Sequence, residues 1–365
     1  MKNVLKISFV IIGTMIGAGF ASGQEINLFF YHYGNIGILG MILSCLLTSF
    51  IIYQVFQILQ KRNIHNYAEF LENINSYKKR NKMIQIMINT FLLLSYYIMV
   101  AGYCAYFRQE FQIPIWISAS IMALLCYLAF RCNMKGVISI NTLLIPFLIL
   151  FIFYLGLKNI PFLNSYFSQP SNLNIVFTSS VNWLISSIIY ASYNSILLIP
   201  ILIELNEKIE NKATIKKVSI FCFVVLSILG LSLCGLLIRG EGYSQDLELP
   251  IIQIVKEFGA IYPFIYGIVI IAAIFTSAIS AGYGFLKNVT KTDKDYKRLV
   301  VLLCISSVFI SFIGFSNLIN LLYPIFGVLG LIQIVQIIKN RNKVFLTTSN
   351  RNSIIKYRKS EEKGL

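Results

Sequence analysis

Charged side chains are scarce in this sequence. Only 13% of its 365 residues are Asp, Glu, Lys or Arg, whereas 57% are hydrophobic and the mean hydropathy is +0.73. Soluble globular domains carry about twice that share of charge. The composition therefore excludes an ordinary soluble domain and predicts an all-α integral membrane protein.

Metal-binding and disulfide patterns are also lacking. The chain has two histidines, and its seven cysteines are odd in number and show no CxxC spacing. Neither a zinc site nor a disulfide framework is indicated, and no cofactor is expected. No predicted span pairs a nucleophile with a base or contains an acidic pair, which argues against an enzyme.

Apolar runs long enough to cross a bilayer are abundant by contrast. A spanning helix needs about 17–25 such residues, and ten runs qualify: 4–31, 36–60, 83–107, 112–130, 136–157, 175–203, 217–238, 260–286, 299–314 and 317–338. A signal peptide is the alternative for the first run, because Lys2 and Lys6 precede it. The apolar run resumes at 26–30, which favours a span. Residues 1–339 are thus expected to form one transmembrane domain, and 340–365 a basic cytoplasmic tail.

The net charge of +16 reflects where the basic residues lie. All but four of the 31 Lys and Arg residues fall near the termini or in alternate connections, and the exceptions are Arg108, Lys158, Arg239 and Lys256. By the positive-inside rule, both termini of this multi-pass protein are expected on the cytoplasmic side of the cell membrane. The charge indicates topology and contact with the lipid bilayer, and it does not indicate nucleic-acid binding.

Ten spans with both ends on one side divide into five plus five, with the second half inverted, as in many secondary transporters. The expected repeats are about 4–158 and about 175–338. The first span of each half is the unusual one. Span one contains GTMIGAGFASGQE at 13–25, and span six reads NWLISSIIYASYNSILLIPILIE at 182–204.

The glycines of span one allow two interpretations. Gly17, Ala18 and Gly19 form the segment where the helix opens at least cost, because each glycine destabilises a helix by about 1 kcal/mol relative to alanine. Opened backbone is tolerated at membrane depth only beside protein or a wet cavity, so a break here would face a binding site. Alternatively, Gly13 and Gly17 belong to a GxxxG face that packs closely against another helix.

Glu25 favours the first interpretation, because it is the only carboxylate inside any of the ten runs. A charge at membrane depth costs about 3 kcal/mol on the permissive insertion scale and usually has a function. Glu25 could carry a proton, lie near the amine of a solute or shape the outer half of a cavity. Alternatively, it lies shallow enough to reach the external interface.

Span eight contains the segment AAIFTSAISAGYGF. Small and hydroxyl-bearing side chains recur in it at helical spacing, so they lie on one face of the helix. Its members are Ala273, Thr276, Ser277, Ser280 and Gly284. Such a face lets another helix approach closely. Its hydroxyls can also complete a shell of carbonyl oxygens around a monovalent cation, and a broken span one would supply such carbonyls.

The segments GTMIGAGFASGQEI and YGNIGILG resemble the opening of the YkvI-type bacterial membrane proteins, and the resemblance extends over essentially the whole chain. Those proteins are similar to the amino acid–polyamine–organocation superfamily, which has the LeuT fold. The resemblance implies five-plus-five inverted repeats, broken first and sixth helices, and a substrate site between them. It also implies a sodium site formed by the carbonyls of Gly13, Ile16 and Ala273 and the hydroxyls of Thr276 and Ser277.

One position departs from that family pattern. Where the best-known sodium-coupled relatives place an asparagine after the glycine break, this chain has Phe20. A second sodium site is therefore not expected.

The candidate substrate site draws on three spans. Gly17, Ala18, Gly19 and Glu25 come from span one. The fold implied by the resemblance adds Tyr96 and Tyr97 of span three, and it adds Tyr190, Ser192 and Asn194, which flank the expected break in span six.

Two connections have helical patterns, 61–82 and 246–259. The first is interpreted as an interfacial helix, and the second as either a lid over a cavity or a plain surface helix. We therefore expect a cation-coupled secondary transporter of a small zwitterionic solute, an amino acid in the first instance, with sodium favoured over protons. The alternative is a transporter-like receptor or assembly subunit that binds a small molecule without moving it.

Overall fold

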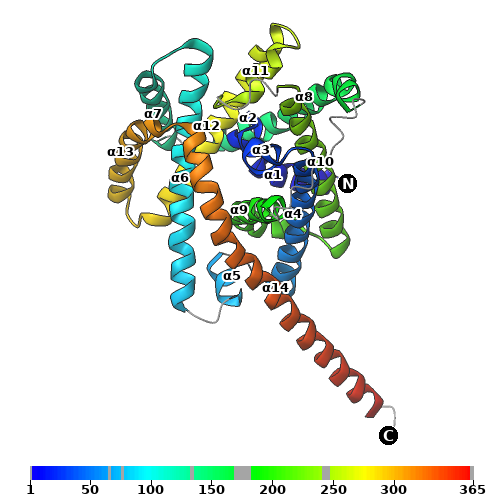
Figure 1. Cartoon of the computed structure of the whole chain (residues 1–365). Helices are drawn as coiled ribbons and strands as arrows, with labels where there is room; N and C mark the ends of the chain where they lie inside the picture. The colour runs from blue at the N-terminus through cyan, green and yellow to red at the C-terminus, as the bar shows by residue number, and fades with distance from the viewer. Residues whose placement is uncertain are drawn as a thin grey trace.

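The computed structural model describes residues 2–64, 67–74, 78–131, 135–167, 182–240 and 247–361, and all regular structure in these residues is helical (Figure 1). The first half contains α1 (Lys2–Met15), α2 (Ala18–Ser22), α3 (Gln24–Phe29), α4 (Asn35–Arg62), α5 (Tyr67–Ile74), α6 (Lys78–Phe111), α7 (Ile115–Arg131) and α8 (Lys135–Phe167). The second half contains α9 (Asn182–Leu205), α10 (Lys212–Arg239), α11 (Pro250–Lys256), α12 (Ile261–Val289), α13 (Asp293–Ile310) and α14 (Phe315–Glu361). Short 3-10 turns occur at Tyr31–Tyr33, Asn206–Lys208 and Ser311–Ile313.

The helices coincide with the predicted spans. Eight are long and apolar enough to cross a membrane, and two shorter apolar helices, Asn3–Met15 and Ile115–Arg131, fall in the first and fourth predicted runs. The start of the sixth run, 175–181, lies outside the described residues. The chain is a multi-pass membrane protein.

Contacts between the halves follow the five-plus-five arrangement. The second, third and fourth spans of the first half are α4, α6 and α7, and their counterparts in the second half are α10, α12 and α13. Each packs against its counterpart, α4 with α10, α6 with α12 and α7 with α13. Such pairing is what two halves related by a pseudo-two-fold axis would produce.

The sixth span differs from the prediction. α9 runs without interruption from Asn182 to Leu205, so the expected break around residues 190–194 is absent from the described helix. The polar side chains that suggested a break bond back to carbonyls of their own helix. Ser192 Oγ donates to Ile188 O at 2.6 Å, and Asn194 Nδ2 donates to Tyr190 O at 3.0 Å. These local bonds satisfy the Ser192 hydroxyl proton and the Asn194 amide donor without opening the helix.

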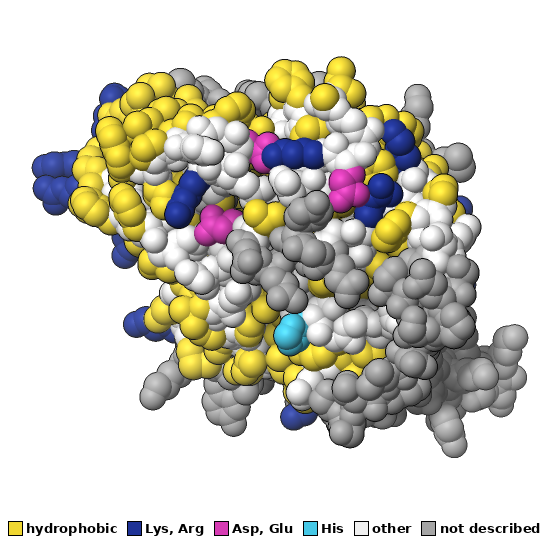
Figure 2. Space-filling view, turned by 45° about the horizontal axis from the view of Figure 1, so that its top comes forward, with side chains coloured by type: hydrophobic (Ala, Val, Ile, Leu, Met, Phe, Trp, Pro, Cys, Tyr) yellow, Lys and Arg dark blue, Asp and Glu magenta, His cyan; other side chains and the backbone are white. Residues whose placement is uncertain are grey.

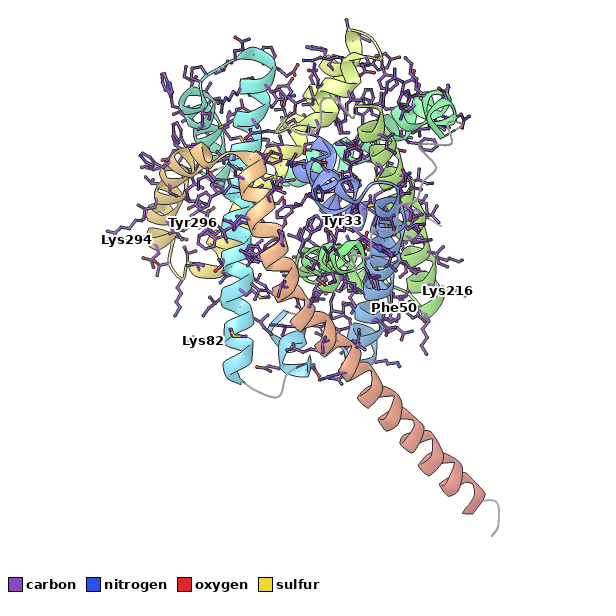
Figure 3. All side chains as sticks on the ribbon, in the orientation of Figure 1. Tyr33, Phe50, Lys82, Lys216, Lys294 and Tyr296 are labelled. Atoms are coloured by element: carbon purple, nitrogen blue, oxygen red, sulfur yellow. The ribbon has the colours of Figure 1, made fainter. Side chains whose placement is uncertain are left out.

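The bundle has two distinct ends. Lys82 and Lys216 point outward at the end from which the last part of α14 projects, and α11 lies at the opposite end (Figures 1 and 3). α14 continues as one helix through the predicted domain boundary at residue 339, and its final part projects away from the bundle (Figure 1).

The predicted helix in connection 61–82 is present as α5, which packs against α6 and α14. Residues 65–66 and 75–77 of this connection lie outside the described residues.

Candidate functional site

The first span is interrupted at Ile16 and Gly17. α1 ends at Met15, and Gly17 is extended, with φ −84° and ψ −174°, where α2 begins. The Gly17 amide donates to Met15 O at 2.9 Å instead of continuing the helical pattern. Among the described residues, the carbonyls of Gly13, Thr14 and Ile16 accept no backbone hydrogen bond. The predicted break is confirmed, and it leaves acceptors for a ligand or water.

A second interruption follows at Gly23, which has φ +84° and separates α2 from α3. A side chain is excluded here, because a Cβ atom would lie 2.5 Å from Ile251 Cγ1 of α11. Glycine is therefore required both by the positive φ and by the close approach of α11. The two breaks isolate α2 as a five-residue segment.

Glu25 lies in the first turn of α3 and is only 3% exposed. The Tyr193 hydroxyl donates a hydrogen bond to its Oε2 atom, and the Tyr323 hydroxyl is directed at the same carboxyl. The side chain folds back over Gly19, where even a Cβ atom would collide with the carboxyl. This burial inside the protein excludes the alternative in which Glu25 reaches the external interface.

Aromatic rings surround this carboxyl. Tyr193 stacks on Phe29 with 5.8 Å between ring centroids and on Tyr323 with 4.7 Å. Tyr190 meets Phe29 and Phe30 edge to face, at 5.3 and 4.9 Å. We call Phe29, Phe30, Tyr190, Tyr193 and Tyr323 the aromatic cage. It joins α3 to α9 and α14.

The three α9 residues predicted for the site, Tyr190, Ser192 and Asn194, are all buried. Tyr190 belongs to the cage, and its hydroxyl is directed at Glu25 and Tyr193 without forming a hydrogen bond of regular geometry. Asn194 Oδ1 has no hydrogen-bond partner among the described residues. Ser192 instead faces α14, because a Cβ on Gly330 would overlap the Ser192 backbone. The structure thus brings Tyr190 to Glu25 but directs Ser192 into a helix contact.

Tyr96 and Tyr97 point elsewhere, which corrects their assignment to the substrate site. The Tyr97 hydroxyl lies 2.8 Å from Ser306 Oγ, and the Tyr96 hydroxyl lies 3.5 Å from Ser307 Oγ. Both partners belong to α13. The two tyrosines therefore connect α6 to α13 and not to the break in span one.

The five predicted sodium ligands come from the interrupted part of span one and from α12. Gly13 faces α8, since a Cβ there would collide with Ile145. Thr276 Oγ1 donates to the Ala272 and Ala273 carbonyls of its own helix, at 3.0 and 3.2 Å. α12 packs on α2, immediately after the break. The free carbonyls of Gly13 and Ile16 thus remain available, whereas the Ala273 carbonyl and the Thr276 hydroxyl bond to each other.

α11 covers the broken span from one end, which supports the lid interpretation over a plain surface helix. Four of its apolar residues are fully buried: Ile251, Ile252, Ile254 and Val255. The helix packs on α2, α10 and α12. The part of the predicted helix at residue 246 lies outside the described residues.

Two ion pairs and two hydrogen bonds connect α11 and its flanking residues to the rest of the bundle. Arg239 Nε lies 2.7 Å from Glu257, and Lys256 Nζ lies 2.9 Å from Glu110. Gln109 exchanges two hydrogen bonds with the backbone of Leu249, at 3.1 and 3.2 Å. Figure 2 shows acidic and basic side chains close together on this face. These contacts hold α11 and its flanking residues against α6 and α10.

Glu248, just before the lid, gives an expected pH dependence. Its carboxyl accepts a hydrogen bond from the Phe315 amide at 3.2 Å, at the start of α14. Burial nevertheless raises the pKa of Glu248 above its ordinary value of 4.5, although the Phe315 amide and Arg108 oppose this. The folded chain therefore binds a proton at Glu248 more tightly than the unfolded chain does. Protonation of Glu248 then stabilises the fold most below pH 4.5. This stabilisation is lost as the pH rises through the raised pKa of Glu248.

Glu248→Gln removes the ionisation and is expected to flatten that part of the pH profile and to raise the melting temperature at neutral pH. The measurement is thermal unfolding of both proteins in detergent from about pH 4 to about pH 8. Parallel profiles for the two proteins would show that Glu248 does not contribute.

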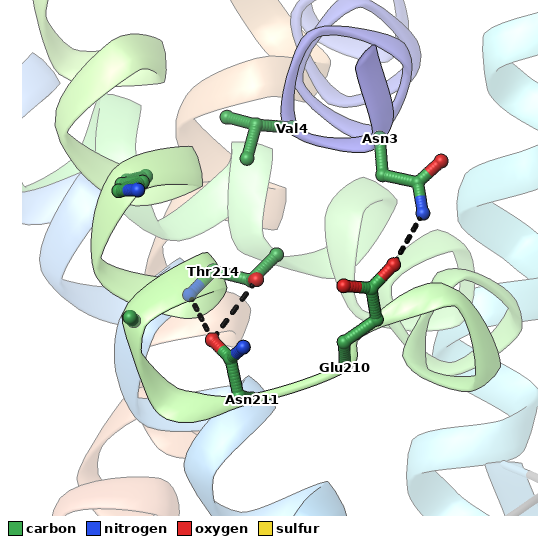
Figure 4. Close-up of a pocket in the computed structure, with 7 residues that line it drawn as sticks. Asn3, Val4, Glu210, Asn211 and Thr214 are labelled. Atoms are coloured by element: carbon green, nitrogen blue, oxygen red, sulfur yellow. Dashed lines mark hydrogen bonds between the residues drawn. The ribbon is translucent and has the colours of Figure 1, made fainter. Parts of the chain in front are cut away.

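A polar pocket lies at the end of α1 opposite the lid (Figure 4). It has a volume of about 440 Å³ and is lined by residues of α1 and of the segment before and within α10. Asn3 Nδ2 donates to Glu210 Oε1 at 2.7 Å across it. This hydrogen bond links the first half of the broken span to the connection after α9.

Sequence reasoning missed four of the five residues of the aromatic cage, namely Phe29, Phe30, Tyr193 and Tyr323. Tyr193 lies three positions after Tyr190, so helical spacing places both on one face of α9 and could have identified it. Tyr323 lies in an apolar run of α14 with no local signal, and only packing brings it to Glu25.

Comparison with known proteins identifies relatives and a fold. The chain is 28% identical over 288 residues to the uncharacterized membrane protein YkvI of Bacillus subtilis (strain 168), covering 78% of this chain and 80% of that protein. It is 26% identical over 283 residues to the protein YyaD of the same organism, covering 77% and 79%. No family model matches the chain.

Among solved structures, the chain resembles a Na+-coupled sialic acid symporter in a substrate-bound outward-open state. The TM-score is 0.54 at 14% identity, covering 85% of this chain and 74% of the symporter. This similarity concerns the fold alone. The chain is thus a homologue of the YkvI-type membrane proteins, and it has the LeuT-like fold.

Proposed function

We propose that the chain is a secondary transporter that carries a small solute with an ammonium group, in the first instance a zwitterionic amino acid, across the cell membrane by alternating access. Its movement is coupled to a cation. The observation that carries the proposal is the interrupted first span, which leaves free carbonyls at the end of α1 and a buried carboxyl folded over Gly19 of α2. Backbone carbonyls without hydrogen bonds and a single carboxyl are both energetically costly at membrane depth. In the proposed function, these groups bind a charged solute and a cation.

The two ends of the broken span provide the gates in this proposal. The positive-inside rule makes the α11 end external and places both termini in the cytoplasm. The lid closes the external side. On the cytoplasmic side, opening would move α1 away from the connection after α9 and break the hydrogen bond between Asn3 and Glu210.

Sodium remains the first candidate for the coupling cation. The carbonyls of Gly13 and Ile16 are free to coordinate it, and the symporter that shares the fold is Na+-coupled. The Thr276 hydroxyl donates its proton to the Ala272 and Ala273 carbonyls, so its oxygen keeps lone pairs with which it would complete the shell. A proton held by Glu25 is the alternative coupling ion.

Uptake into liposomes tests the proposal. Labelled amino acids should accumulate faster with an inward sodium gradient, and Thr276→Ala combined with Ser277→Ala should remove the dependence on sodium. Ser280→Ala is the matched control, because Ser280 belongs to the same small-residue face but is not a predicted ligand.

Three results would change the proposal. Sodium stimulation that survives in the double variant would reject the sodium site. Uptake driven only by a proton gradient would replace sodium with protons. Binding without accumulation under any gradient would favour the receptor alternative over transport.

A further inference from the structure

Lys158 differs from the other basic residues at the α11 end of the bundle. The sequence predicts four basic residues on the side of the membrane opposite the termini. Three of them have an acidic neighbour: Arg239 lies beside Glu257, Lys256 beside Glu110 and Arg108 near Glu248. Lys158 forms no ion pair with any of the described residues. Its exposed ammonium group is therefore available to an anionic ligand.

Two tyrosine hydroxyls lie next to this ammonium group, which is in the last third of α8. Lys158 Nζ lies 2.9 Å from the hydroxyl of Tyr262, in the first turn of α12, and 3.4 Å from Phe258 O. The hydroxyls of Tyr262 and Tyr154 lie 3.1 Å apart, and the two rings stack with 6.2 Å between centroids. Lys158 Nζ also lies 4.2 Å from the centroid of the Tyr262 ring. We call Tyr154, Lys158 and Tyr262 the lysine–tyrosine cluster.

The lysine–tyrosine cluster contains more hydrogen-bond donors than it uses. An ammonium group has three donors and no acceptor, and each tyrosine hydroxyl has one donor. Three of these five donors are used, in the contacts of Lys158 with Tyr262 and Phe258 and in the contact between the two hydroxyls. One donor remains on the ammonium group and one on the tyrosine pair. Donors beside a positive charge suit an oxyanion, which accepts several hydrogen bonds and is attracted by the charge.

The helices that carry the cluster present apolar side chains to lipid. α8 packs on α12, and both are long and apolar enough to cross a membrane. The exposed apolar residues are Phe147, Leu150 and Leu157 on α8, and Ile261, Phe264 and Ile268 on α12. Lysine and tyrosine at the end of such helices place their polar atoms at the level of the lipid headgroups. The oxyanion available at that depth is the phosphate of a phospholipid.

We propose that the lysine–tyrosine cluster binds the headgroup of an anionic phospholipid, with the phosphate on Lys158 and Tyr154 and the acyl chains along the exposed faces of α8 and α12. In the orientation expected from the basic residues, this lipid belongs to the outer leaflet. The cluster contains no residue of the candidate functional site, so this inference goes beyond the proposed function and does not depend on it.

The bound lipid is also expected to stabilise the fold near the lid. Lys158 contacts Phe258, which lies two residues after the end of α11, and Tyr262 of α12. Lys158 Nζ lies 5.7 Å from the centroid of the Phe258 ring as well. A headgroup that fixes the ammonium group in this position would hold α8, α12 and the segment after α11 together. Binding to the folded state alone raises the apparent stability of a protein.

Lipid binding to the purified full-length protein in detergent tests the inference. Phosphatidylglycerol is the anionic probe, and phosphatidylcholine with the same acyl chains is the control without net charge. Native mass spectrometry counts the bound lipids, and thermal unfolding at increasing lipid concentration gives the apparent affinity. We expect phosphatidylglycerol to bind about tenfold more tightly than phosphatidylcholine, the ratio expected for one added charge-assisted contact.

Variants separate this site from a general attraction between anionic lipid and a basic protein. Lys158→Gln should weaken phosphatidylglycerol binding by about tenfold, whereas Lys158→Arg keeps the charge and should retain most of the binding. Tyr154→Phe keeps the ring and removes one hydroxyl, so it should weaken binding by about threefold. Lys287→Gln removes the same charge at an exposed position near the other end of α12 and should leave the affinity within about twofold.

The inference is overturned if phosphatidylglycerol binds no more tightly than phosphatidylcholine, or if Lys158→Gln binds it as the unmodified protein does. Equal losses in Lys158→Gln and Lys287→Gln would attribute the binding to net charge and would also overturn it. Competition by free glycerol phosphate at the same concentration as the lipid would show a site for soluble phosphate and not for lipid. A Lys158→Gln protein that melts earlier but keeps the preference for phosphatidylglycerol would limit Lys158 to a structural role.

Discussion

Glu25→Gln is expected to reduce the initial rate of solute uptake by about tenfold or more, the effect of losing one charge-assisted contact. The substitution keeps the size of the side chain and an acceptor for Tyr193, and it removes only the negative charge. Because an unpaired carboxyl at membrane depth is costly, the variant is also expected to unfold at the same or a higher temperature. Loss of function without loss of stability would identify a charge kept for binding.

The measurement is uptake into proteoliposomes, with thermal unfolding recorded on the same preparations. Glu204→Gln serves as the control and should transport like the unmodified protein. Uptake by Glu25→Gln within about twofold of the unmodified rate, a difference well under 1 kcal/mol, would show that the carboxylate is not needed.

Two glycines of the broken span are expected to respond oppositely to the same added methyl group. In Gly19→Ala the new Cβ would overlap the Glu25 carboxyl, which Tyr193 and the cage hold in place. Overpacking of this kind costs about 1–3 kcal/mol, and displacement of the carboxyl should lower uptake by about tenfold. In Gly17→Ala the Cβ meets nothing within 4 Å and the backbone has a negative φ, so stability should change by no more than about 0.5 kcal/mol.

Melting temperatures and uptake rates of the two variants, measured side by side, check this expectation. If Gly19→Ala unfolds and transports like Gly17→Ala, the carboxyl does not lie over Gly19. If Gly17→Ala alone is destabilised, the open space beside the break is absent.

The spans and the first break could be predicted because their signals are local. Hydropathy over about 20 residues defines a membrane helix, and the glycines at 13, 17 and 19 mark where one opens. The number of spans and the positions of the basic residues predicted the five-plus-five arrangement, the resemblance to YkvI-type proteins implied it as well, and the helix contacts and the shared fold agree with it.

The continuity of α9 could not be read from its composition. Serine and asparagine are compatible with a broken helix, where they would bind a ligand, and with an intact helix, where they bond to their own carbonyls. Ser192 and Asn194 do the latter. α9 contains no glycine, and its internal Pro200 does not interrupt it; in the first span, by contrast, the break falls at a glycine.

The helix toward which a side chain points could not be predicted from the sequence either. Tyr96 and Tyr190 are both tyrosines in apolar helices, yet Tyr96 reaches α13 and Tyr190 joins the cage around Glu25. Tyr323 joins the same cage from a distant helix. These placements depend on how helices rotate against one another, which single-helix periodicity does not specify.

Thiol labelling at Gly17 tests the central claim most directly, namely that the first span opens onto a wet interior. Gly17→Cys, in a chain whose native cysteines are replaced by alanine, should react with a charged, membrane-impermeant thiol reagent, and a bound solute should slow the reaction. Leu150→Cys is the control, because Leu150 is 64% exposed on an apolar span that faces lipid and should stay unreactive. If Gly17→Cys is as inert as Leu150→Cys in every ionic and solute condition, the break does not meet water and the account is contradicted.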